Sequence, residues 1–196
     1  MSRIFVFEGL DLSGKSKAIE ILDYKLRELN YNVGTNKGAL CTNDILKGQI
    51  ENSMSRFEKD LYYTYLLTQD KWLPIKKENQ IILQDRYYPS VMFYGLLYSS
   101  SKSLINRLPL YTFREVENFF YFRCSFEERL RRYNKRELNG NDDSLSLQTK
   151  DEHKRRMELF DQIMQKVQLE FENVISIDTT KKKPEELASD IIPYII

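Results

Sequence analysis

The chain has 196 residues, of which 41% are hydrophobic and 30% charged, a composition typical of one soluble globular domain. Thirty basic and 29 acidic side chains nearly cancel, which argues against a surface that collects nucleic acid or anionic lipid. The longest early apolar run, Ile4 to Phe7, is too short for a signal peptide or a transmembrane helix, so we expect a cytoplasmic protein that binds no membrane.

Short apolar runs predict the strands. Four of them are continuous rather than alternating, as in strands covered on both faces: Ile4 to Phe7, Ile81 to Leu83, Phe119 to Phe122 and Val174 to Ile177. A further strand is predicted near Tyr31 to Thr35. Because long segments with helical period separate these runs, we expect an α/β fold with a parallel sheet and helices on both sides.

The intervening segments predict helices. Three sets of residues follow helical spacing: Ala18, Leu22, Leu26 and Leu29; Phe57, Leu61 and Tyr65; and His153, Met157, Phe160, Met164, Val167 and Phe171. Four helix starts carry capping signals: Ser55 with Glu58, Ser125 with Glu128, Thr149 with Glu152, and Pro184. The third set indicates that His153, the only histidine, packs against the core rather than catalyses.

Cysteine and histidine are too scarce for several kinds of site. Cys41 and Cys124 are far apart in sequence, and neither belongs to a Cys-x-x-Cys motif. These counts exclude a usual zinc site and a disulfide framework. We expect both thiols to be buried and inert.

The residues after the first predicted strand carry the strongest indication of chemistry. Gly9 to Ser16 fits the pattern G-x-x-x-x-G-K-[ST], between a predicted strand and a predicted helix. Such a loop lets successive N–H groups converge on phosphate oxygens at a helix N-terminus. We expect Lys15 to bridge the β- and γ-phosphates of ATP and Ser16 to ligate Mg²⁺. The predicted ATP contacts are Gly9, Leu12, Ser13, Gly14, Lys15, Ser16 and Lys17.

A second element agrees with this loop. The run from Ile81 to Asp85 places a carboxylate at the end of a buried strand, where ligands bind in open parallel sheets. We expect Asp85 to hold Mg²⁺ directly or through water. The next residue, Arg86, is suited to clamp a phosphate with two parallel hydrogen bonds.

A third element is a helix rich in cations. Five of them fall within eight residues: Arg129, Arg131, Arg132, Lys135 and Arg136. This helix precedes residues 138–147, which are rich in Asn, Asp, Ser and Gly, and we expect a lid loop over 138–150. Because Arg132 and Arg136 share a helix face, one of them is predicted to meet the charge of the transferring phosphoryl group.

These motifs resemble those of thymidylate kinases, the P-loop enzymes that phosphorylate dTMP with ATP. The resemblance spans nearly the whole chain and rests on four stretches: Phe7 to Asp11 leading into Ser13 to Ser16; Asp85-Arg86-Tyr87 followed by Ser90; Arg136-Glu137-Leu138; and the helix after Ile177-Asp178. It implies one P-loop nucleotide kinase domain over residues 1–196, in three α/β/α layers with a five-stranded parallel sheet and a lid. It also implies a homodimer packed through helices.

For individual residues, the resemblance implies that Asp11 faces the deoxyribose 3′-hydroxyl, that Arg86 holds the acceptor phosphate and that Tyr94 lies near the sugar. Lys37 stands where the family has Arg-Glu-Pro-Gly, and Lys71 stands nearest the Arg that reads the thymine carbonyl. Leu67 stands where the family has a Phe that stacks on thymine, and Val91 stands where it often has an Asn or Thr that faces the base. Segment 139–148, where the family often has a catalytic Arg, contains no cation. The predicted acceptor contacts are Asp11, Lys37, Leu67, Lys71, Arg86, Ser90, Val91 and Tyr94.

Three functions remain open at this point. A nucleoside monophosphate kinase, most of all for dTMP, is favoured because the second strand ends in Asn36 and Lys37, whereas a hydroxyl acceptor calls for a nearby base. A kinase for a nucleoside or another small molecule is the second. A non-catalytic nucleotide-binding homologue is the third, supported by the missing base readers and by Asp142 and Asp143 in the expected lid.

Overall fold

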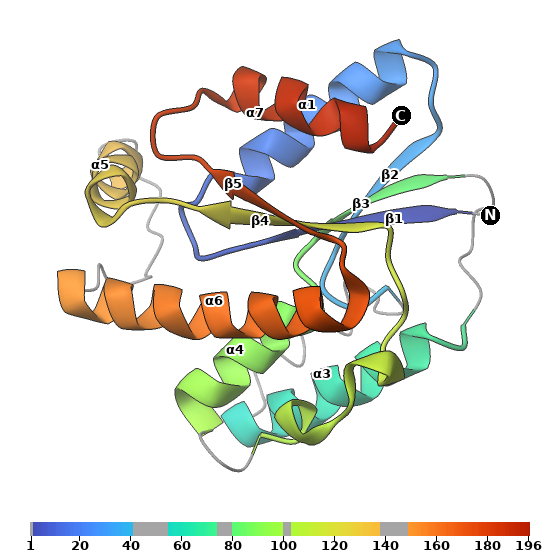
Figure 1. The fold of residues 1–196 in the computed structure, drawn as a ribbon, viewed down its shortest axis with the longest axis vertical. Helices are drawn as coiled ribbons and strands as arrows, with labels where there is room; N and C mark the ends of the chain where they lie inside the picture. Colours follow the sequence, from blue (N-terminus) through green and yellow to red (C-terminus); the bar gives the residue numbers. More distant parts are fainter. Residues whose placement is uncertain (1, 41–54, 74–79, 100–102, 138–148) are drawn as a thin grey trace.

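Five parallel strands form the centre of the molecule (Figure 1). The structure is a computed structural model that describes residues 2–40, 55–73, 80–99, 103–137 and 149–196. The strands are β1 Arg3–Glu8, β2 Val33–Lys37, β3 Ile81–Asp85, β4 Asn118–Arg123 and β5 Val174–Asp178. Their order across the sheet is β2-β3-β1-β4-β5. All five predicted strands and their parallel arrangement are confirmed.

Helices cover both faces of this sheet, as the sequence predicts. On one face lie α1 Lys15–Glu28 and α7 Pro184–Ile191; on the other lie α3 Arg56–Asp70, α4 Tyr88–Ser99 and α6 Lys150–Phe171, with α5 Phe126–Glu137 beside the start of α6 (Figure 1). Short 3₁₀ turns span Ile105–Arg107, Leu110–Thr112 and Ile192–Tyr194. Within the described residues, every helix is too short or too polar to cross a membrane.

Alternation along β1 divides the hydrophobic core into two halves. Ile4 and Val6 pack on the side of α3, α4 and α6, and Phe5 and Phe7 pack on the side of α1 and α7. All four side chains are buried, because successive side chains of a strand point to opposite faces and helices cover both.

The edge strand β5 is less covered than its apolar sequence suggests. Only Ile177 is fully buried in it, and the other residues are partly or fully exposed. An edge strand has one neighbour, so helices shield it less completely than β1.

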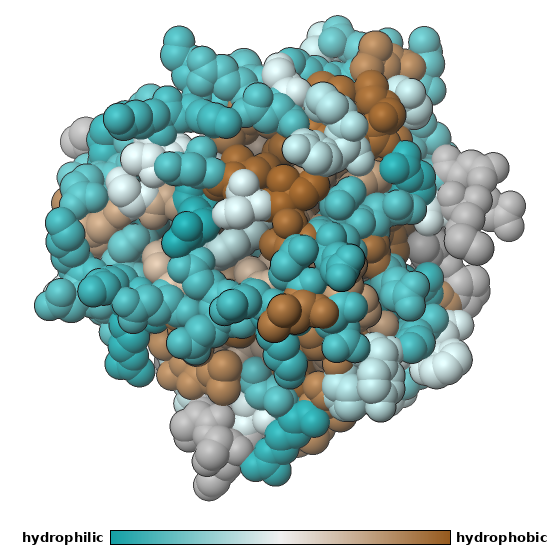
Figure 2. Space-filling model, viewed as in Figure 1, coloured by the Kyte–Doolittle hydropathy of each residue, from teal (hydrophilic) through white to brown (hydrophobic). Residues whose placement is uncertain are grey.

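The surface of the molecule is mostly hydrophilic on the face shown in Figure 2, and the hydrophobic residues visible there gather in its middle and upper part.

The four predicted helix starts are confirmed. Ser55 and Glu58 form the capping box of α3, Ser125 accepts from the N–H of Glu128 at the start of α5, Thr149 caps α6, and Pro184 opens α7. Thr149 and Lys150 therefore belong to the start of α6, and the expected lid loop over 138–150 ends before them. The remainder of that loop, 138–148, lies outside the described residues.

The apolar spacing on α3 marks the face turned away from the core. Phe57, Leu61 and Tyr65 are 50%, 39% and 60% exposed. The buried residues of α3 include Leu66 and Leu67 instead. The helix and its apolar stripe were predicted, but the exposure of that stripe was not.

Strand order determines where a site lies. From β1 the chain continues first to β2 and β3 on one side and then to β4 and β5 on the other. In open parallel sheets, ligands bind beyond the carboxyl ends of the strands at the point where the connections diverge. Here that point is the end of β1, where the loop Gly9 to Ser16 begins.

Candidate active site

The loop after β1 has the backbone of an anion-binding turn. Gly9 has φ +136°, and a Cβ there would lie 2.3 Å from the carbonyl oxygen of Phe122, so only glycine fits. Gly14 has φ +96° and caps α1 without a side-chain hydrogen bond. The first N–H groups of α1 are therefore left without a side-chain cap, which makes this helix terminus suited to a phosphate.

Lys15 lies under the loop. Its side chain is buried, and its Nζ donates to the carbonyl oxygens of Gly9 at 2.7 Å and Leu10 at 2.9 Å. Burial and the adjacent Arg86 cation lower the pKa of Lys15 to about 7. The same lysine that the sequence assigned to phosphate thus also holds the loop.

Ser16 and Asp85 meet beside the start of α1, as the sequence predicts. The Ser16 hydroxyl donates to Oδ2 of Asp85 at 3.3 Å. Oδ1 of Asp85 is buried and has no hydrogen-bond partner in the described part of the chain. A hydroxyl beside a carboxylate with an unused oxygen fits Mg²⁺, which binds one or two protein oxygens and completes its shell with phosphates and water.

A polar network links the loop to the start of α4. Arg86 forms an ion pair with Asp11 and donates to Ser90 Oγ at 3.0 Å. The Tyr94 hydroxyl donates a hydrogen bond to Oδ2 of Asp11 at 3.2 Å. The sequence predicted that these four residues share a site, and the structure brings them together. The fifth member, Glu8, was not predicted: it is buried and accepts from Ser90 Oγ at 2.5 Å.

Charge within this network follows its geometry. Burial alone would raise the pKa of Asp11, but the Arg86 and Lys15 cations lower it below its usual value, so Asp11 is a carboxylate. Burial raises the pKa of Glu8. Asp11 can therefore accept a hydrogen bond from a ligand hydroxyl, whereas Glu8 serves to fix Ser90.

Arg86 is held in an unusual backbone conformation. Its φ is +68°, a region that favours glycine. Its N–H donates to the carbonyl of Phe7 at 3.1 Å, and the buried Gln84 donates to its carbonyl at 2.7 Å. This conformation directs the guanidinium toward Asp11 and the cavity, and Gln84 was not identified from the sequence.

A cavity of about 400 Å³ opens beside this network, between α3 and α4. Arg86 and Lys37 line the end near the sheet, and the predicted Leu67, Ser90, Val91 and Tyr94 line its walls. Lys59, Tyr63 and Tyr98 also line it and were not predicted. Lys59, Tyr63 and Leu67 are spaced by four along α3, so their spacing places them on one helix face.

Three predicted side chains lie elsewhere or are not described. The ammonium group of Lys71 donates to the carbonyl of Tyr111, and Lys71 is not among the residues that line the cavity, so its reading of the acceptor base stays a prediction. Lys17 pairs with Glu20 at 2.6 Å on the exposed side of α1, instead of facing the loop. Arg136 belongs to α5, but its side chain lies outside the described part of the structure.

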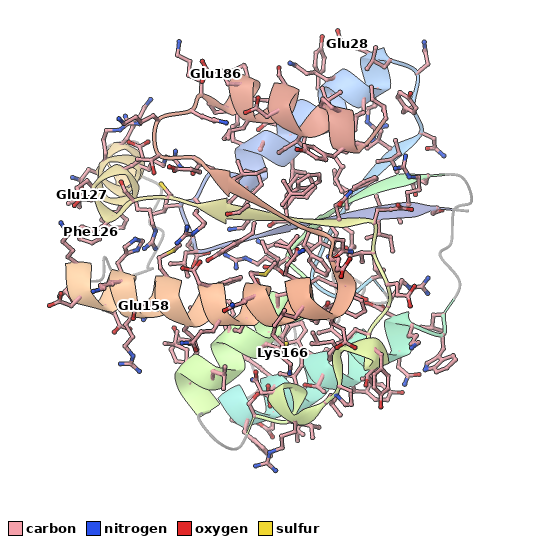
Figure 3. The ribbon with its side chains drawn as sticks, viewed as in Figure 1. Glu28, Phe126, Glu127, Glu158, Lys166 and Glu186 are labelled. Atoms are coloured by element: carbon pink, nitrogen blue, oxygen red, sulfur yellow. The ribbon has the colours of Figure 1, made fainter. Side chains whose placement is uncertain are left out.

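Two arginines of α5 reach the loop. Arg132 donates to the carbonyl of Leu12 at 2.9 Å and Arg129 to that of Asp11 at 2.8 Å. Arg129 also contacts Nδ1 of His153, which is buried at the first turn of α6, as its helical spacing predicts. In Figure 3, Phe126 and Glu127 mark the place where α5 lies beside that end of α6.

Comparison with known proteins identifies the family. The family model for thymidylate kinase matches residues 7–191. The thymidylate kinase of Candida albicans has a similar fold, with a TM-score of 0.66 and 18% identity over 99% of this chain and 91% of that chain. The Ehrlichia chaffeensis thymidylate kinase gives 0.63 and 14% identity, covering 100% of this chain and 99% of that chain. No curated protein matches the chain in sequence.

Proposed function

The chain belongs to the thymidylate kinase family of nucleoside monophosphate kinases, and on that premise we propose that it transfers the γ-phosphoryl group of ATP to the 5′-phosphate of dTMP. One observation supports this most: the network of Asp11, Arg86, Ser90 and Tyr94 joins the phosphate-binding loop to the cavity. A donor phosphate on the loop and an acceptor phosphate at Arg86 would therefore meet at this network.

The donor side uses the loop Gly9 to Ser16. Its N–H groups and the N-terminus of α1 bind the phosphates, and Lys15 stabilises the charge that develops on transfer. Ser16 and Asp85 would hold Mg²⁺, which when bound neutralises charge on the β- and γ-phosphates.

The acceptor side needs no general base, because a phosphate is already ionised. Arg86 binds that phosphate, with Lys37 as a second cation at the same end of the cavity. Asp11 accepts from the 3′-hydroxyl, and Tyr94 lies beside the sugar. Asp11 is paired with Arg86, which suits it to bind rather than to deprotonate an acceptor.

Base recognition is assigned to the end of the cavity away from the sheet. Leu67 and Val91 contribute apolar walls, and Tyr63 and Tyr98 contribute rings. Lys59 also lines the cavity, on the same face of α3 as Tyr63 and Leu67, and an ammonium group donates to a carbonyl oxygen. We assign to Lys59 the role that the sequence gave to Lys71, and it favours bases with a 4-oxo group, such as thymine and uracil, over cytosine.

The assembly and location belong to the same proposal. We propose a homodimer, supported by the family resemblance and by the exposed apolar stripe Phe57, Leu61 and Tyr65 on α3. A cytoplasmic location rests on the family resemblance.

A panel of acceptors tests the function. The full chain with ATP and Mg²⁺ is expected to form ADP in the presence of dTMP or dUMP, more slowly with dCMP, and not with thymidine, which lacks the phosphate that Arg86 binds. Turnover of thymidine but not dTMP would instead support a nucleoside kinase. ATP binding without turnover of any acceptor would support a non-catalytic homologue.

A further inference from the structure

Every backbone carbonyl from Gly9 to Ser13 faces a side-chain donor. Lys15 serves the first two, as described above. The next three are served from elements that lie far along the chain. The pairs are Arg129 Nε with Asp11 at 2.8 Å, Arg132 Nη1 with Leu12 at 2.9 Å, and Thr179 Oγ1 with Ser13 at 2.7 Å.

The direction of these carbonyls determines what the N–H groups can do. A phosphate-binding turn needs successive N–H groups to converge on the anion, so its carbonyl oxygens must find partners elsewhere. Donors behind the loop provide those partners. The caps thus favour the conformation of the loop that binds an anion.

Leu12 shows that this conformation needs support. Its φ of +65° is left-handed, which costs a side-chain-bearing residue about 1–2 kcal/mol. Such strain persists only where surrounding contacts fix the backbone. Gly14 leaves room for Arg132 to approach the loop. A Cβ at this position would lie only 3.2 Å from Arg132 Nη1, which is closer than an ordinary van der Waals contact.

Each guanidinium nitrogen of Arg132 donates to an acceptor within the protein. Besides the Leu12 carbonyl, the guanidinium donates from Nε to Glu128 at 2.8 Å and from Nη2 to the carbonyl of Thr179 at 2.7 Å. All three of its nitrogens therefore contact the protein. A charge so placed lies against the carbonyl side of the loop, whereas phosphates bind on the N–H side.

We propose that Arg129, Arg132 and Thr179 are positioning residues that hold the phosphate-binding loop by capping three consecutive carbonyls, and that Arg132 does not contact the transferred phosphoryl group. The proposal rests on the proposed function in one respect, namely that this loop binds the phosphates of ATP. Of the two arginines predicted from the sequence to meet the charge of the transferring phosphoryl group, Arg132 and Arg136, it gives Arg132 a positioning role instead.

Binding of ADP by the full chain separates the two roles of Arg132, because ADP lacks the γ-phosphoryl group. We expect Arg132→Ala to weaken ADP binding about tenfold or more, measured by isothermal titration, and Arg132→Lys to restore part of it by capping one carbonyl. Arg131→Ala is the matched control: Arg131 is 65% exposed, and its hydrogen bonds within the described part of the chain go to the same Glu128 rather than to the loop. Wild-type ADP affinity in Arg132→Ala, with a lower kcat, would overturn the proposal.

Thr179 provides a test that changes no charge. Thr179→Val keeps the shape but loses the donor, so we expect ADP binding to weaken about fivefold, whereas Thr179→Ser keeps wild-type affinity. This pair decides the matter if circular dichroism shows that Arg132→Ala does not fold. Equal ADP affinity in the Val and Ser variants would refute the proposal while leaving the kinase function in place. A wild-type chain that binds no ADP would refute both.

Discussion

At the scale of single residues, backbone strain coincides with the site. Among the described residues, four that are not glycine have positive φ. Of these, Leu12 follows Asp11 in the chain and Arg86 pairs with Asp11. The other two, Asn30 and Glu172, lie two residues past the end of α1 and one residue past the end of α6, where a left-handed residue commonly ends a helix. Strain at Leu12 and Arg86 is therefore associated with binding rather than with chain reversal.

Lys15 carries the first prediction. Lys15→Ala is expected to lower kcat about a hundredfold or more, because an electrostatic group that stabilises the transition state is lost. The assay is ADP formation at saturating ATP and dTMP, with thermal melting to confirm folding. Lys25→Ala, on the same helix and bonded to Ser189, is the control. Near-normal turnover in Lys15→Ala would contradict the assignment of the loop.

At the scale of elements, α3 separates two lysines that the sequence alone does not distinguish. Lys59 lines the cavity, and Lys71, just past the end of the helix, lies over the Trp72 ring and contacts the Tyr111 carbonyl. Helix periodicity does not explain the difference, because Lys59 and Lys71 both fall in the series of fours that contains Leu67. The position does: Lys71 lies past Asp70, the last residue of α3, where its side chain reaches the Tyr111 carbonyl.

This difference gives a paired prediction. Lys59→Met is expected to raise KM for dTMP about tenfold while kcat changes little, the pattern for a lost binding contact, and to leave KM for dCMP nearly unchanged. Lys71→Met is expected to keep both constants. Steady-state kinetics with the two nucleotides decides it, and the reverse pattern would return base recognition to Lys71.

The contact between α5 and α6 predicts a dependence of stability on pH. Burial and the neighbouring Arg129 lower the pKa of His153 from 6.5 to about 4. The imidazole therefore binds a proton more readily in the unfolded chain than in the folded one. The contribution of His153 to the free energy of unfolding is fully present above about pH 6.5 and is lost as the pH falls toward 4.

Between pH 7 and 5, the wild type is expected to lose on the order of 2 kcal/mol more unfolding free energy than His153→Gln, which does not titrate. Urea denaturation at both pH values measures the difference. Parallel losses in the two proteins would show that His153 does not titrate between folded and unfolded states.

At the scale of the whole molecule, the exposed stripe on α3 predicts association. Three large apolar side chains spaced by four form a continuous ridge on one helix, which suits a helical interface. Sedimentation is expected to give twice the chain mass of 23.5 kDa for the wild type. Leu61→Glu is expected to shift it toward the monomer, because a charge in an apolar interface is not solvated.

Leu29→Glu, at the end of α1 on the opposite face of the sheet, is the control for that experiment and is expected to remain a dimer. A monomeric wild type, or a dimer unaffected by Leu61→Glu, would exclude this stripe as the interface.

The sequence by itself determined what depends on neighbouring residues. Continuous apolar runs predicted the strands, and the residues from Gly9 to Ser16 predicted a phosphate-binding turn. Both predictions succeed because strand formation and turn geometry depend mainly on residues that are close together in the sequence. Asp85 and Arg86 were placed for the same reason, since residues that end adjacent parallel strands meet at one edge of the sheet.

Tertiary structure decided which partner each long side chain takes. The spacing on α5 identified a cationic face, but Arg129 and Arg132 meet carbonyls 118 and 120 residues away. Likewise, local patterning identified α3 but not its inward face, because apolar residues occur on both sides of it. Flexible cationic side chains reach several acceptors at similar energetic cost, so only the packed arrangement of α5, β5 and the loop selects carbonyl oxygens as the partners of these arginines.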